Sequence, residues 1–243
     1  MLALYLKEIR SFLSSIIGYV VIIVFLLLNS LFTWVFPGQF NTLENGYANL
    51  DTLFIIAPWV FLFLIPAITM RSFAEEQKNG TIELLLTKPL TELQLVLAKY
   101  LAGLTLVIIA LIPTLIYYLS VYQLGTPVGN IDSGGTFGSY IGLLFLGSAF
   151  VSIGIFASSI TQNQIIAFIF ALLLCFFFHT GFDAIAAIPV FSPIDSFIIN
   201  LGINEHFIAL SRGVIDTRDV IYFIGLTIIL LICTQTKIKS RKW

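Results

Sequence analysis

The chain has 243 residues, of which 58% are hydrophobic and 10% are charged, and its formal net charge is −1. Soluble domains carry about 25% charged residues, so this composition excludes an ordinary soluble protein and predicts a single membrane domain over residues 1–243. The few basic residues form no stripe among aromatic side chains, so nucleic-acid binding is not predicted.

The first fifteen residues predict a helix on the membrane surface. Leu2, Leu6 and Ile9 recur every three to four positions, whereas Lys7 and Glu8 fall largely on the other side. This pattern is typical of a helix that lies in the headgroup plane. The alternative is a disordered basic N-terminus that only sets the topology.

Six apolar stretches are long enough to span a bilayer, which takes about 20 residues in a helix. These predicted spans are residues 16–36, 53–70, 93–118, 137–160, 164–182 and 220–234. The first lacks a small-residue cleavage site, so we interpret it as a retained anchor. The predicted fold is therefore all-α, a polytopic membrane protein with six transmembrane helices.

The distribution of positive charge predicts the orientation of the spans. Of the twelve Lys and Arg residues, only Arg212 and Arg218 fall on one side. The others fall on the side that holds both termini and the connection between the second and third spans. By the positive-inside rule, both termini are expected in the cytoplasm.

The polar connection over residues 71–92 predicts two short helices. Gly80 is expected to end the first, because glycine tolerates the left-handed conformation after a helix. Thr81 is expected to cap the second, and Pro89 to stop it. The third span then opens at Thr91, whose partner in a capping box would be Gln94.

Two capped helices on a membrane protein are expected to dock on a partner, with an apolar flank on the second. The predicted contact residues are Glu75, Glu76, Gly80, Thr81 and Glu83, and the flank is Leu84, Leu85 and Leu86. An ordinary solvated loop is the alternative.

Two basic residues mark the membrane boundary of this region, as a cytoplasmic gate or as topology anchors. Arg71 follows the second span, and Lys99 lies early in the third. Arg71 lies one turn before Glu75, so an ion pair is one expectation. The other is a guanidinium that only reaches the headgroups.

The fourth span carries small residues four positions apart. Gly138 and Gly142 form one pair, and Gly154 and Ser158 form another. Such pairs allow helices to approach closely. Packing within the chain and packing between subunits both account for them.

The outer segment over residues 183–219 is long and apolar, but its pieces are too short to span. Pro189, Pro193 and Gly202 interrupt it, which favours short re-entrant or interfacial helices. The acids expected to orient these helices or to cap the sixth span include Asp195, Asp216 and Asp219.

No nucleotide, metal or other cofactor site is predicted in this chain. Residues 129–134 have the glycine spacing of a P-loop, but Gly135 stands where lysine is needed. His179 and Asp183 lie near the outer end of the fifth span, where water readily hydrates polar groups. Their presence there therefore favours a hydrated position over a role in proton transfer or metal binding. The chain is therefore not expected to hydrolyse ATP.

The connection between the second and third spans resembles that of type-2 ABC exporter permeases. The residues that carry this resemblance are Arg71, Glu75, Glu76, Gly80-Thr81-Ile82-Glu83-Leu84-Leu85, Pro89 and Lys99. Further resemblance lies in Lys7-Glu8-x-Arg10-Ser11-Phe12, in Ser192-Pro193-Ile194-Asp195 and in residues 212–223. Together these are similar to the branch with the gliding-motility permease subunit of Bacteroidetes and the nitrous oxide reductase maturation permeases.

The resemblance implies partners that the residues alone do not. It implies a homo- or heterodimer of permeases in the bacterial cytoplasmic membrane and a cytoplasmic ABC ATPase subunit that binds ATP and Mg²⁺. An accessory subunit, and a link to gliding motility or secretion, also come from the resemblance.

Two other functions remain open from the sequence. One is a non-transporting membrane scaffold of a motility or secretion machine, which would use the same docking element. The other is an ion-coupled carrier, which is disfavoured because the spans carry almost no charge.

Overall fold

The structure is a computed structural model that describes residues 1–86 and 90–240. Over these residues it is all-helical, and six helices are long and apolar enough to cross a membrane. The predicted fold class is confirmed. The spanning segments are Ile16–Val35, Asp51–Lys78, Glu92–Leu124, Ser133–Ile160, Gln164–Ala186 and Thr217–Lys239.

The first half of the chain holds three of these segments. Its helices are α1 (Leu2–Leu13), α2 (Ile16–Ser30), η1 (Leu31–Val35), α3 (Asp51–Thr69), α4 (Ala74–Lys78), α5 (Thr81–Leu86), α6 (Glu92–Leu111), η2 (Ile112–Thr114) and α7 (Leu115–Leu124). The third segment runs past the predicted end at residue 118 because Pro113 stands at the start of the 3₁₀ turn η2, where its missing N–H is tolerated.

The second half holds the other three. Its helices are α8 (Ser133–Ile160), α9 (Gln164–Phe176), η3 (Phe177–Gly181), α10 (Phe182–Ala186), η4 (Pro189–Ile194), α11 (Asp195–Ile199), α12 (Ile203–Ser211) and α13 (Thr217–Lys239). The fourth and sixth segments begin before the predicted residues 137 and 220. Asp132 and Asp216 cap them, with carboxylates that accept from the backbone N–H groups of Gly135 and Arg218.

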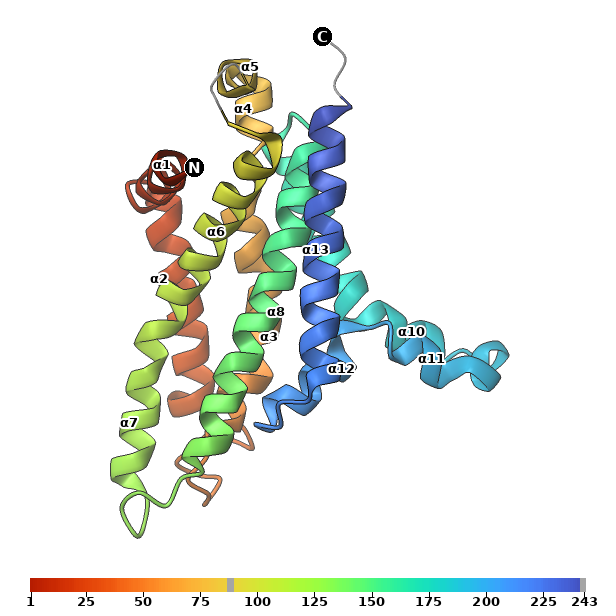
Figure 1. Cartoon of the computed structure of the whole chain (residues 1–243). Helices are drawn as coiled ribbons and strands as arrows, with labels where there is room; N and C mark the ends of the chain where they lie inside the picture. Colours follow the sequence, from red (N-terminus) through yellow and green to blue (C-terminus); the bar gives the residue numbers. More distant parts are fainter. Residues whose placement is uncertain (87–89, 241–243) are drawn as a thin grey trace.

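The start of α1, the C-terminal end of α13 and the pair α4–α5 lie at one end of the bundle (Figure 1). The loop after α7 lies at the opposite end. Helix α1 lies across the bundle axis and packs on α6, where the Tyr5 hydroxyl is 2.9 Å from the Thr105 hydroxyl. The predicted N-terminal helix is therefore present, and the disordered alternative is wrong.

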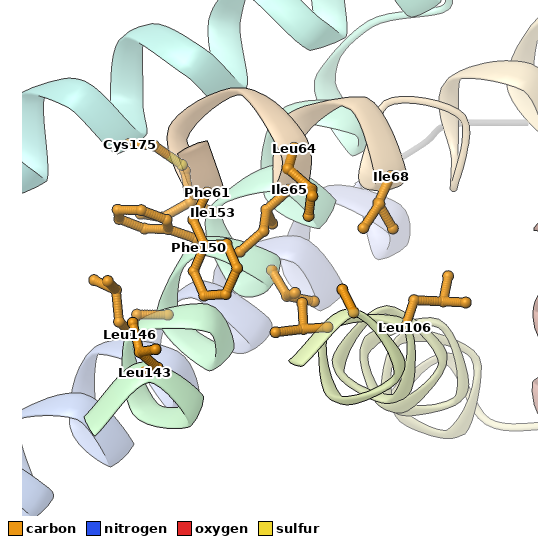
Figure 2. Close-up of a cluster of buried hydrophobic side chains, with 14 of the residues drawn as sticks. Phe61, Leu64, Ile65, Ile68, Leu106, Leu143, Leu146, Phe150, Ile153 and Cys175 are labelled. Carbon is orange, nitrogen blue, oxygen red and sulfur yellow. The ribbon is translucent and has the colours of Figure 1, made fainter. Parts of the chain in front are cut away.

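The core is a cluster of apolar side chains where α3, α6, α8 and α9 meet (Figure 2). Phe61 and Ile65 of α3 face Phe150 of α8, and Cys175 of α9 closes one side. In a bilayer, lipid tails are as apolar as these side chains, so close packing stabilises the bundle more than removal from water does.

The small residues of α8 are used for packing within the chain. A Cβ at Gly142 would lie 2.8 Å from Leu210 of α12, and one at Gly138 would lie 2.8 Å from the Cα of Gly213. A Cβ at Gly154 would collide with Thr69 of α3. Of the two readings from the sequence, these contacts favour intrachain packing.

The outer segment contains the short helices that the proline and glycine positions predict. Pro189 begins η4, and Gly202 is the N-cap of α12. Helices α10 and α11 project sideways from the bundle (Figure 1), whereas α12 packs on α8. Their depth in a membrane stays a prediction.

Candidate functional site

Residues 70–73 connect α3 to α4, and we call them the elbow. Hydrogen bonds attach the elbow and the start of α4 to the end of α8. The Ser158 hydroxyl accepts from the backbone N–H groups of Phe73 and Ala74, at 3.0 and 3.1 Å, and donates to the Met70 carbonyl at 3.0 Å. The Gln77 amide donates to the Ser159 carbonyl at 2.9 Å. These bonds satisfy the start of α4 in a buried position, where an unpaired N–H is costly.

Four charged side chains from three helices meet beside this elbow, and we call them the ion cluster: Lys7 and Glu8 of α1, Glu76 of α4 and Lys99 of α6. Lys99 Nζ lies 2.9 Å from Glu8 Oε1 and 2.9 Å from Glu76 Oε2. Lys7 Nζ lies 3.1 Å from Glu8 Oε1 and 3.0 Å from Glu76 Oε1. The ion cluster has no net charge and joins α1, α4 and α6.

Lys99 is the most buried member, with 1% of its side chain exposed. Its ammonium also donates to the Ser72 carbonyl at 2.6 Å and lies 5.0 Å from the centre of the Phe73 ring. A buried ammonium is tolerated only when it is paired and hydrogen-bonded. Glu8 of α1 and Glu76 of α4 supply the paired charges for this ammonium.

The ion cluster shifts the titration of its α1 members. Burial alone would raise the pKa of Glu8, but the ammonium groups of Lys99 and Lys7 outweigh it and lower the pKa. Burial alone would lower the pKa of Lys7, but Glu8 and Glu76 outweigh it and raise the pKa. Both groups are thus held in their charged forms.

This arrangement corrects the expectation for Glu76. The sequence places it with the acids that face a partner, but its side chain is buried and forms ion pairs with Lys99 and Lys7. The ion pairs that Lys7 and Glu8 form in the ion cluster were not predicted from the sequence. The available signal is the lysine at position 99, which lies inside an apolar span and requires an acidic partner.

The tip between α4 and α5 is exposed. Gly80 has φ +70°, the left-handed conformation predicted for the residue after a helix. The side chains of Lys78, Asn79, Thr81 and Glu83 are exposed, as is Gly80, and we call these five residues the exposed tip. Ile82 is buried beneath it.

The predicted role of Thr81 as the cap of α5 stays a prediction. Thr81 is the first residue of α5, and its hydroxyl donates to the Glu76 carbonyl at 3.3 Å. The turn at Gly80 is so tight that the next helix begins immediately. Pro89 and the side chains of Leu84 and Leu86, which were expected to stop α5 and to form its apolar flank, lie outside the described part of the chain.

The capping box at the start of α6 is confirmed. The Thr91 hydroxyl accepts from the Gln94 backbone N–H at 3.2 Å, and the Gln94 side chain accepts from the Thr91 N–H at 3.1 Å. The start of the third span is therefore fixed by its own sequence.

The expected ion pair between Arg71 and Glu75 is wrong. Arg71 makes no ion pair within residues 1–86 and 90–240, and its Nε is buried without a hydrogen-bond partner there. The backbone still places the two residues one turn apart, since the Glu75 N–H donates to the Arg71 carbonyl at 3.4 Å. Both side chains instead line a cavity beside the ion cluster.

At the opposite end, acids connect the outer helices to α13. Asp219 Oδ1 lies 2.7 Å from Nδ1 of His206 in α12, and the His206 ring stacks on Tyr222 with 3.9 Å between centroids. Asp216 is the N-cap of α13, and Asp195 is the first residue of α11. The sequence predicted no role for His206, because its partner is on another helix.

Within the described residues, His179 and Asp183 form no hydrogen bond or ion pair with each other. His179 is buried against Trp59 and Phe150, whereas the Asp183 carboxylate accepts from Asn204 at 2.9 Å. Among the described residues, no group of three side chains is placed to hold a metal ion.

The sequence profile of the ABC-2 family transporter proteins matches residues 2–234. The chain therefore belongs to the ABC-2 transporter family. Permeases of this family typically pair with a cytoplasmic ATPase. No curated protein matches the chain.

Proposed function

We propose that this chain is the transmembrane permease subunit of an ATP-driven ABC-2 exporter. In this proposal a separate ATPase subunit binds ATP and Mg²⁺ and docks on the exposed tip. The observation that carries the proposal is the attachment of α4, which leads directly into the exposed tip, to the third and fourth spans, through Lys99 of the ion cluster and Ser158.

The surface offered to the ATPase is small and polar. Lys78 and Glu83 supply opposite charges on either side of Gly80. Glu76 is not part of this surface in the proposal, because it is buried in the ion cluster. Glu75 is half-buried and lies at its margin.

Movement of α4 would reach the membrane by two routes. Glu76 would transmit it to Lys99 in α6 and to α1, and Ser158 would transmit it to α8. These contacts stabilise one arrangement of the helices. If the ATPase binds a second arrangement more tightly in one nucleotide state, its docking shifts the bundle toward that arrangement.

The sidedness of the charges supports a cytoplasmic position for the exposed tip and for both termini, in a bacterial cytoplasmic membrane. A second permease chain, identical or related, would complete the translocation path, and an accessory subunit is part of the same proposal. The resemblance of residues 192–195 and 212–223 supports an assignment to gliding motility or secretion.

The test is co-expression with the ATPase encoded beside it, followed by co-purification and measurement of ATP turnover. Glu83→Arg reverses an exposed charge in the first turn of α5, and Glu205→Arg makes the same change in the first turn of α12, at the other end of the bundle. We expect the first variant to lose the ATPase and the second to retain it. Equal retention by both variants would contradict the proposed docking surface.

A further inference from the structure

A polar cavity of about 290 Å³ lies beside the ion cluster, between α1, the elbow after α3 and α6. A water molecule occupies about 30 Å³ of liquid, so this volume is far larger than a single bridging water needs. The ion cluster on its wall is neutral in itself. Arg71 and Glu75 are the charged lining residues without an ion pair in the described part of the chain.

Arg71 lacks an acceptor in this cavity. Its Nε is buried, and no described residue accepts a hydrogen bond from it. A buried N–H of a charged group without a partner is costly. The planar guanidinium matches phosphate oxygens in a bidentate geometry, so the missing acceptor fits a phosphate group.

An apolar groove of about 560 Å³ begins where the cavity ends. It runs between α2 and α3, and hydrophobic side chains such as Val24, Leu28 and Phe63 form its wall. Ala67 lines both the cavity and the groove. Because α2 and α3 are spanning helices, the groove lies at membrane depth, where its contents are hydrocarbon.

We propose that the cavity and the groove together bind one glycerophospholipid. Arg71 binds its phosphate, Glu75 accepts hydrogen bonds from a primary ammonium on the head group, and one acyl chain lies in the groove between α2 and α3. The opposite charges of Arg71 and Glu75 match such a zwitterionic head group. Arg71, Glu75 and the groove residues are not part of the exposed tip, although Asn79 and Thr81 of the tip also line the cavity.

The test is native mass spectrometry of the full chain after delipidation, with defined lipids added back. The probes are phosphatidylethanolamine, phosphatidylcholine, whose ammonium cannot donate a hydrogen bond, phosphatidylglycerol and inorganic phosphate. We expect one phosphatidylethanolamine per chain, bound about tenfold more tightly than the other two lipids. Equal binding of the three lipids, or of inorganic phosphate alone, would overturn the proposal.

Three variants locate the lipid. Arg71→Gln removes the phosphate ligand, Ala67→Trp blocks the junction of cavity and groove, and Arg212→Gln changes an exposed arginine at the other end. We expect the first two to lose the bound lipid and the third to keep it, and all three to have the thermal midpoint of the unmodified chain when delipidated. Retention of the lipid by Arg71→Gln would overturn the assignment. A dimer in which a second copy of the chain fills the groove, so that lipid binds elsewhere, would overturn it as well.

Discussion

Lys99 and Glu76 join the third span to the short helix α4 through an ion pair of 2.9 Å. Lys99 is almost fully buried, and Glu76 also binds Lys7 of α1. The pair therefore connects the exposed tip with α6 and α1, whereas the outer helices meet α13 through a separate contact, Asp219 with His206.

Replacement of Lys99 by alanine is expected to destabilise the protein. It would leave Glu8 and Glu76 with only the more exposed Lys7 as a shared cation, and a broken buried pair costs about 3–5 kcal/mol. Thermal unfolding in detergent measures the loss, with Arg212→Ala as the exposed control. Adding Glu76→Gln to Lys99→Ala should recover part of the loss, and no recovery would contradict the pairing.

The attachment of α1 should depend on pH through Glu8 and Lys7. Glu8 has a lowered pKa, so its stabilisation is complete above the ordinary value of 4.5 and is lost as the pH falls through the lowered pKa. Lys7 has a raised pKa, so its stabilisation is complete below 10.5 and is lost as the pH rises through the raised pKa. The thermal midpoint should therefore decrease when the pH drops below the lowered pKa of Glu8 or rises above the raised pKa of Lys7.

Glu8→Gln tests whether Glu8 causes the decrease of the thermal midpoint at acid pH. It should lower the midpoint at neutral pH and flatten the decline below pH 4.5. An acid decline identical to that of the unmodified chain would show that other carboxylates are responsible.

Ser158→Ala should loosen the elbow between α3 and α4. The change leaves the N–H groups of Phe73 and Ala74 buried without an acceptor, at a cost of about 1–3 kcal/mol. Hydrogen exchange at these two amides, compared with the exposed control Ser240→Ala, measures it directly. Unchanged protection in Ser158→Ala would contradict the role given to this hydroxyl.

Gly142→Ala should separate α8 from α12. The added Cβ would lie 2.8 Å from Leu210, and overpacking of this kind costs about 1–3 kcal/mol. Gly225→Ala is the matched control, since a Cβ there meets nothing within 4 Å. Equal thermal midpoints for the two variants would rule out the close approach.

Features that depend on local sequence were predictable. The turn at Gly80 and the capping box of Thr91 and Gln94 follow from residues within a few positions of one another. The spans follow from hydropathy, although Asp132 and Asp216 start two of them earlier than hydropathy alone indicates.

The ion cluster was not predictable, because its members are distant in sequence. Glu8 and Lys99 are 91 positions apart, and only the packing of α1 across α6 brings them together. The same packing removes Glu76 from the docking surface. The expected pairing of Arg71 with Glu75 failed although the two residues lie one helical turn apart, because this spacing permits an ion pair but does not require one.

The most direct measurement is ATP turnover of the complex with the neighbouring ATPase, for Glu76→Gln against the unmodified permease. The Glu76 side chain is buried and is not part of the exposed tip, so we expect the variant to bind the ATPase normally but to lose most of the permease-dependent turnover. A cooperative thermal transition above the assay temperature would show that the variant is folded. Normal turnover in a folded Glu76→Gln variant would contradict transmission through the ion cluster.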